Sequence, residues 1–143
     1  MPYSSVDDMK GLLPEEVLVQ LTDDEGLGSV NRQRVEEAIA QADAEIDSWC
    51  GERYAVPFST VPAVVKKMSA DIAVYNLYCR RVAEMPEVRK DRYRNAVRQL
   101  EAISKGAVSL GVDPAPSASR DGRAETNKAA SDQVFTRDKL EGF

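Results

Sequence analysis

An unbroken apolar stripe over residues 31–51 constrains the fold more than any other feature of the sequence. Its members follow at steps of four, three, four and three residues, and they are Val35, Ile39, Ala42, Ile46 and Trp49. This spacing places them on one face of an α-helix, and such a face is buried against another helix. Asn31 is a suitable N-cap, and Gly51 is expected to close the helix. The stripe therefore predicts helical packing partners elsewhere in the chain.

A second long helix is predicted over residues 62–82, where Pro62 suits the first turn. One apolar stripe along it consists of Val64, Met68, Ile72, Tyr75, Cys79 and Val82. Three further apolar side chains, Val74, Leu77 and Tyr78, lie outside this stripe. A helix that is apolar around most of its circumference is central or is contacted on two sides. We therefore expect Val74, Leu77 and Tyr78 to contact a second subunit.

A third long helix is predicted over residues 86–105, with Gly106 as its end. Its core positions are Val88, Tyr93, Val97, Leu100 and Ile103. Its other face is basic and carries Arg89, Lys90, Arg92, Arg94, Arg98 and Lys105. Because Glu87, Asp91 and Glu101 are interleaved, the preferred interpretation is a charged face that meets solvent or a subunit. The alternative is a nucleic-acid-binding accessory or packaging protein that uses this Arg-rich helix.

The N-terminal region predicts one or two short helices. Ser5 and Asp8 have the spacing of a capping box, which indicates a helical turn over residues 4–10 that Gly11 ends. Pro14 is expected to open a second short helix. The acidic loop that follows, residues 23–25, lacks the ligand spacing of a calcium loop and is predicted to be solvated. The fold class is therefore all-α, a small helical bundle over residues 1–111.

The composition changes after residue 111. Residues 112–133 are rich in Pro, Ser, Ala and mixed charges and cannot bury enough apolar surface to offset ordering entropy, so we expect an extended, flexible C-terminal arm. Apolar side chains return in residues 134–143, which indicates a docking segment on this linker. The alternative is that the segment folds back on its own bundle. The residues expected to contact a partner here are Val134, Phe135, Arg137, Leu140 and Phe143.

Residue types exclude most catalytic chemistry. The sequence contains no histidine, which removes Ser-His-Asp and Cys-His nucleophile systems and most zinc sites. Its two cysteines, Cys50 and Cys79, are too few for a disulfide scaffold and are expected to be buried thiols. Asp71 comes closest to an acid in a catalytic setting, but an Arg53 or Arg80 partner would explain it structurally. We expect no enzyme, no cofactor and no metal.

Charge and hydropathy limit the partners. The formal net charge is −5 and the pI about 4.9, which argues against tight binding of nucleic acid but not against DNA passing by. The sequence lacks a run of about 18–20 apolar residues that could span a membrane. Its first residues lack the basic start and apolar run of a signal peptide. We therefore expect a protein that stays in the reducing cytosol, or one that leaves the cell inside a particle.

Several short motifs, taken in order along the chain, resemble one known family. They are Tyr3, Ala42 with Ile46-Asp47-Ser48-Trp49, Arg53-Tyr54-Ala55-Val56-Pro57-Phe58, Asp71-Ile72-Ala73 with Tyr75-Asn76-Leu77-Tyr78, Arg92-Tyr93 with Ala96 and Leu100, Ile103-Ser104-Lys105-Gly106, Leu110-Gly111, and Val134-Phe135-Thr136-Arg137-Asp138 with Leu140 and Gly142-Phe143. Together they resemble small virion proteins of Mu-like phages and prophages. At one position Trp49-Cys50 stands where that family suggests Tyr-Leu, a change expected to alter packing only.

The resemblance implies a structural protein of the virion, assembled in the bacterial cytoplasm. It implies a head–tail connector or adaptor subunit that forms a ring, commonly of twelve copies, at the neck between portal and tail. The partners would be further copies of the chain, the portal and tail-completion proteins, with DNA only passing through. The broadly apolar helix and the docking segment would supply the two contact surfaces that a ring subunit needs.

Overall fold

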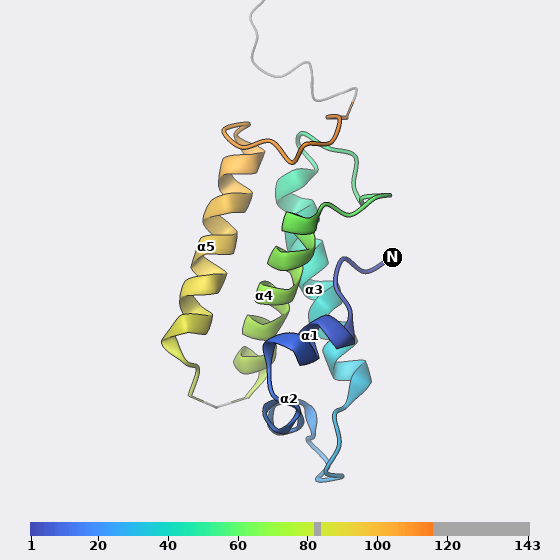
Figure 1. Ribbon diagram of the computed structural model, residues 1–143, viewed down its shortest axis with the longest axis vertical. Helices are drawn as coiled ribbons and strands as arrows, with labels where there is room; N and C mark the ends of the chain where they lie inside the picture. Colours follow the sequence, from blue (N-terminus) through green and yellow to red (C-terminus); the bar gives the residue numbers. More distant parts are fainter. Residues whose placement is uncertain (82–83, 116–143) are drawn as a thin grey trace, which may run out of the picture.

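The computed structural model describes residues 1–81 and 84–115, which form five helices and no strand (Figure 1). The helices are α1 (Val6–Leu12), α2 (Glu15–Thr22), α3 (Arg32–Cys50), α4 (Ala63–Arg80) and α5 (Glu87–Ser104). The predicted all-α class is therefore confirmed, as are three long helices preceded by two short ones. The predicted C-terminal arm, apart from its first residues, lies outside the described residues.

Helix α4 occupies the middle of the bundle. In Figure 1 it lies between α5 on one side and α3 on the other, with α1 and α2 against the lower half of the α3–α4 pair. Its buried residues come from most of its circumference, and they are Val65, Met68, Ser69, Ala70, Asp71, Ile72, Ala73, Val74, Leu77 and Tyr78. The central position expected from its composition is therefore confirmed.

Local sequence signals set several helix ends. The Ser5 hydroxyl accepts the backbone N–H of Asp8 and the Asp8 carboxylate accepts the N–H of Ser5, so the predicted capping box is present. The side chain of Asn31 caps α3 by accepting the backbone N–H of Arg34. Gly106 has a φ of 77° just after α5, a left-handed conformation that glycine adopts without a Cβ clash.

Two glycine predictions need correction. Helix α1 continues through Gly11 to Leu12, and a Cβ at Gly11 would meet nothing within 4 Å, so this glycine does not end the helix. Gly51 caps α3 with a right-handed φ of −62° instead of the expected left-handed one. Its backbone N–H donates to the carbonyl of Asp47, so the chain leaves α3 through one further helical turn.

The stripes of the long helices also differ in part from the prediction. On α4 the buried valine is Val65, whereas Val64 is 37% exposed, and Cys79 is exposed instead of buried. On α5 the core positions Leu100 and Ile103 are buried as expected, but Val88 is 55% exposed. Val88 belongs to the first turn of α5, and the buried residues of this helix, Ala96, Leu100 and Ile103, all lie in its second half. On α3, Cys50 is buried as predicted.

The end of the described chain remains in contact with the bundle. Val112 packs against the core, and the backbone N–H of Ala115 donates to the carbonyl of Arg53 at 2.9 Å. The first residues of the predicted linker therefore lie against the segment that follows α3. This contact fixes the point from which the rest of the chain departs.

Candidate interaction surfaces

The face of α4 that was predicted to meet a second subunit is covered by the protein's own helices. Val74, Leu77 and Tyr78 are 1%, 0% and 8% exposed. The prediction of a contact surface there is corrected, because α2, α3 and α5 all pack on α4 and leave no surplus face. The other predicted contact residues, Val134, Phe135, Arg137, Leu140 and Phe143, lie outside the described residues.

A different surface becomes visible along α3, where the N-terminal segment lies against it. Tyr3 is 3% exposed, and its ring packs on Phe58 with ring centres 5.6 Å apart. Its hydroxyl donates to the Asp47 carboxylate and accepts the backbone N–H of Phe58. These contacts join residues far apart in sequence, and they hold the first residues of the chain on the bundle.

Asp43 supplies the second anchor of this segment. Its carboxylate accepts the backbone N–H of Tyr3 at 2.9 Å and the hydroxyl of Ser69 at 2.6 Å, and Ser69 also shares a hydrogen bond with Ser4. All of these partners are neutral. Burial raises the pKa of Asp43 above its usual 3.8, and the two hydrogen bonds only partly oppose that effect. Burial and the bond to Asp47 likewise raise the pKa of Tyr3.

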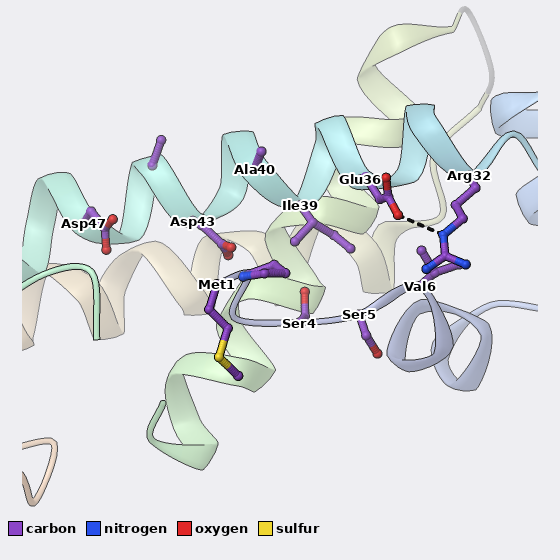
Figure 2. A pocket seen from close by; sticks show the side chains of 12 residues that line it. Met1, Ser4, Ser5, Val6, Arg32, Glu36, Ile39, Ala40, Asp43 and Asp47 are labelled. Atoms are coloured by element: carbon purple, nitrogen blue, oxygen red, sulfur yellow. Dashed lines mark hydrogen bonds and ion pairs between the residues drawn. The ribbon is translucent and has the colours of Figure 1, made fainter. Parts of the chain in front are cut away.

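A groove of about 580 Å³ remains between this segment and α3 (Figure 2). Figure 2 shows Asp43 and Asp47 on the side of α3 that faces the N-terminal segment, with an Arg32–Glu36 ion pair at the other end. The apolar part of the lining consists of Met1, Pro2, Val6, Ile39, Ala40 and Ala44. The small side chains of Ala40 and Ala44 leave space that longer residues would fill. The groove is therefore apolar with an acidic edge.

The sequence alone did not point to this site. The α3 stripe predicts the buried side of the helix correctly, but Asp43 and Asp47 lie off that stripe and carry no signal of a site. Tyr3 was recognised only as a motif residue. The contacts that bring them together span 40 and 44 residues of sequence, so no local pattern encodes them.

The acidic loop after α2 is an ion-pair cluster. Asp24 lies within 2.5–3.3 Å of Arg34, Arg80 and Arg81, which come from α3, α4 and the residue after α4. Hydrogen bonds from Arg81 and Arg80 lower the pKa of Asp24 to about 2. No group of three or more acidic or cysteine side chains with metal-binding geometry occurs in the part of the chain that the structure describes. Residues 24–29 of the loop are exposed, in agreement with the predicted solvation, and Asp24 also joins the ends of three elements through its ion pairs.

Asp71 is explained by pairing, although the predicted partners were wrong. It is 4% exposed, and its carboxylate lies 3.1 Å from Lys67 and 3.5 Å from Arg92 instead of contacting Arg53 or Arg80. Arg80 is engaged with Asp24 and with the carbonyl of Leu21. A buried carboxylate flanked by two cations is a structural ion pair rather than a free general base.

The basic face of α5 is largely neutralised by nearby partners. Arg92 faces Asp71, and Arg89 donates to the carbonyl of Leu12 at 2.7 Å. The remaining ion pairs join Lys90 and Arg94 to Glu87, Arg94 to Asp91, and Lys105 to Glu101. A helix that binds phosphates must present unpaired cations. The paired surface therefore favours the interpretation of a charged face over that of a DNA-binding strip.

Comparison with known proteins decides the family. Residues 3–128 match the family described as Bacteriophage Mu, Gp36. The chain belongs to this family of Mu-like phage proteins. It is 35% identical over 116 residues to the Mu-like prophage FluMu protein gp36 of Haemophilus influenzae. The aligned region makes up 80% of this chain and 79% of that protein. It is also 31% identical over 108 residues to Gene product J of Escherichia phage Mu, and here the aligned region makes up 76% of this chain and 74% of that protein.

The Gp36 match includes all of the described helices and ends before the predicted docking segment at residues 134–143. The resemblance to a Mu-like phage family that the sequence motifs indicated is therefore confirmed. The groove along α3 lies wholly within the matched residues, apart from Met1 and Pro2. Among the described helices of this chain, none is long and apolar enough to cross a membrane.

Proposed function

We propose that this protein is a structural subunit of the virion, a head–tail connector or adaptor that assembles as a ring at the neck between portal and tail. It carries out no catalysis. Its neighbours are further copies of itself, the portal and tail-completion proteins. It is made in the bacterial cytoplasm and leaves the cell as part of the particle.

One observation carries this proposal: the chain offers two unlike candidate surfaces on a compact helical body. The first is the groove between the N-terminal segment and α3, with its apolar lining and acidic edge. The second is the segment at residues 134–143, whose apolar side chains follow a polar stretch. A ring forms when one surface of a subunit fits a different surface of the next. Membership of a Mu-like phage family supports a place in the particle.

The charge of the chain fits a subunit past which DNA moves. The net charge is −5, and most cations of α5 are paired with neighbouring carboxylates. An acidic wall repels phosphate, so DNA is not retained. The same pairing argues against the alternative function, a nucleic-acid-binding accessory protein that uses residues 86–105.

Mass photometry of the full chain, alone and mixed with the portal and tail-completion proteins, tests the proposal. We expect ring-sized particles in the mixture with the portal, with twelve copies as the first size to examine. A chain that stays monomeric and binds neither the portal nor the tail proteins would contradict it. Tight, salt-dependent binding to duplex DNA at about 50 mM salt would favour the alternative function.

A further inference from the structure

We propose that the groove between the N-terminal segment and α3 receives residues 134–143 of a neighbouring copy. This inference rests on the proposed ring and names the two surfaces that join its subunits. It replaces the face of α4, which the protein's own helices cover, as the receiving surface. The groove has a volume of about 580 Å³, enough for several side chains of a peptide.

The groove is suited to apolar side chains that are accompanied by cations. Its wall on α3 is formed by Ile39, Ala40 and Ala44, and Ala40 and Ala44 are exposed. Asp43 and Asp47 lie on the same side of α3, and their hydrogen-bond partners, Tyr3 and Ser69, carry no charge. Among the described residues, no Lys or Arg side chain forms an ion pair with these two carboxylates, and the cation that acts on Asp43 is the N-terminal amino group. A basic side chain of a partner would therefore find a negative potential at Asp43 and Asp47, which the N-terminal amino group offsets only in part.

The segment at residues 134–143 has the complementary chemistry. It carries Val134, Phe135, Leu140 and Phe143 as apolar side chains and Arg137 and Lys139 as cations. Aromatic side chains in a pocket and arginine at its edge are the residue types that dominate binding energy at protein interfaces. The segment also contains Asp138 and Glu141, so the match rests on the presence of Arg137 and Lys139 among its apolar residues rather than on net charge.

The length of the predicted linker permits docking on a neighbour. Ala115 is held beside Arg53, which follows the end of α3. Residues 116–133 reach at most about 60–65 Å when extended, and a flexible coil of that length spans about 20–25 Å. The groove of the same chain is also within this range, because its far end at Arg32 lies about 30 Å from Arg53 along α3. Only docking on the next copy joins subunits through two different surfaces, as a closed ring requires.

Disulfide trapping between two differently labelled full-length chains tests the inference. One chain carries Ala40→Cys and the other carries Leu140→Cys, and both carry Cys79→Ser so that the exposed thiol is removed. The matched control replaces Ala40→Cys by Gln41→Cys, an exposed neighbour that does not line the groove. Adjacent residues of a helix point about 100° apart, so the control differs in direction and not in depth along α3.

We expect oxidation of the mixture to give a disulfide-linked heterodimer several times more abundant than with the control pair. A heterodimer that forms equally with Gln41→Cys would overturn the inference, because it would reflect random collision. A single chain that carries Ala40→Cys and Leu140→Cys and closes only on itself would also overturn it, since the segment would then occupy its own groove. Mass photometry of the unmodified chain with the portal separates the two proposals: rings without the trapped heterodimer leave the proposed function intact and remove this interface.

Discussion

The cluster around Asp24 and the N-terminal site around Asp43 each join distant parts of the chain through a carboxylate, but with different partners. Asp24 is surrounded by three arginines, and its pKa falls to about 2. Asp43 accepts only a backbone N–H and a hydroxyl, and burial raises its pKa. The first arrangement is electrostatically complete within the chain. The second leaves negative charge beside an apolar groove, which is what a surface prepared for a partner requires.

The largest expected effect comes from Tyr3, which closes the N-terminal site. Tyr3→Ala removes a buried ring that packs on Phe58 and leaves the Phe58 N–H and the Asp47 carboxylate without this partner. We expect a loss of about 3–5 kcal/mol of unfolding free energy, measured by urea denaturation. Tyr3→Phe is the control, which keeps the ring and should lose about 1–3 kcal/mol. A loss below about 1 kcal/mol for Tyr3→Ala would mean that the segment is not held on the bundle.

A smaller effect is expected at Ser69, which lies at 0% exposure between Asp43 and Ser4. Ser69→Ala removes a hydrogen bond from each neighbour and should cost about 1–3 kcal/mol, because Ser4 is buried and Asp43 is half-buried. Thermal unfolding followed by circular dichroism measures this loss. Ser104→Ala is a suitable control, since its exposed hydroxyl only donates to the carbonyl of Glu101. Equal shifts for the two variants would show that Asp43 does not depend on Ser69.

The pH dependence of stability should separate the two carboxylates by sign. The pKa of Asp24 is lowered from 3.8 to about 2, so its stabilisation is present above pH 3.8 and is lost as the pH falls toward 2. The pKa of Asp43 is raised above 3.8, so its contribution is complete below that pH and is lost as the pH rises through the folded value.

The unfolding free energies of wild type, Asp24→Asn and Asp43→Asn are measured between about pH 2 and pH 7. The first difference is wild type minus Asp24→Asn, and the second is wild type minus Asp43→Asn. On acidification the first difference should shrink and the second should grow. Two differences that change in the same direction would show that the cationic and neutral surroundings do not act on the carboxylates as described.

The smallest effect on stability is expected for deletion of residues 134–143. If this segment binds a neighbour, its removal should leave helicity and melting temperature nearly unchanged while it weakens assembly. Circular dichroism of the isolated chain measures both quantities. A fall in melting temperature of more than about 5–10 °C, roughly 1–2 kcal/mol, would show that the segment belongs to the core of its own bundle.

Local signals in the sequence predicted where the helices begin and end better than they predicted which side chains pack against each helix. The capping box at Ser5 and Asp8 and the cap at Asn31 depend on neighbours within three residues, and both were predicted. Which face of each helix is covered depends instead on contacts between residues far apart in the sequence. The other four helices all pack against α4, so its apolar positions alone do not show which face is covered. Val74 was therefore predicted to contact a second subunit, although it is buried in the bundle.

The groove illustrates the same limit. Asp43 lies off the apolar stripe of α3, a position at which a polar side chain is usually solvated. Its true environment depends on Tyr3 and Ser69, which approach it from the N-terminal segment and from α4. A pattern of period 3.6 reports which side of a helix is apolar and carries no information about which distant segment crosses the other side.

Mass photometry of two groove variants with the portal tests the account most directly. Ala40→Arg fills the groove and adds a charge that repels Arg137 and Lys139, whereas Gln41→Arg places the same side chain on exposed surface outside it. Ring assembly of Ala40→Arg should require at least about tenfold more protein, equivalent to about 1.4 kcal/mol. Gln41→Arg should assemble like wild type. Equal assembly of both variants and wild type would contradict a subunit interface in the groove along α3.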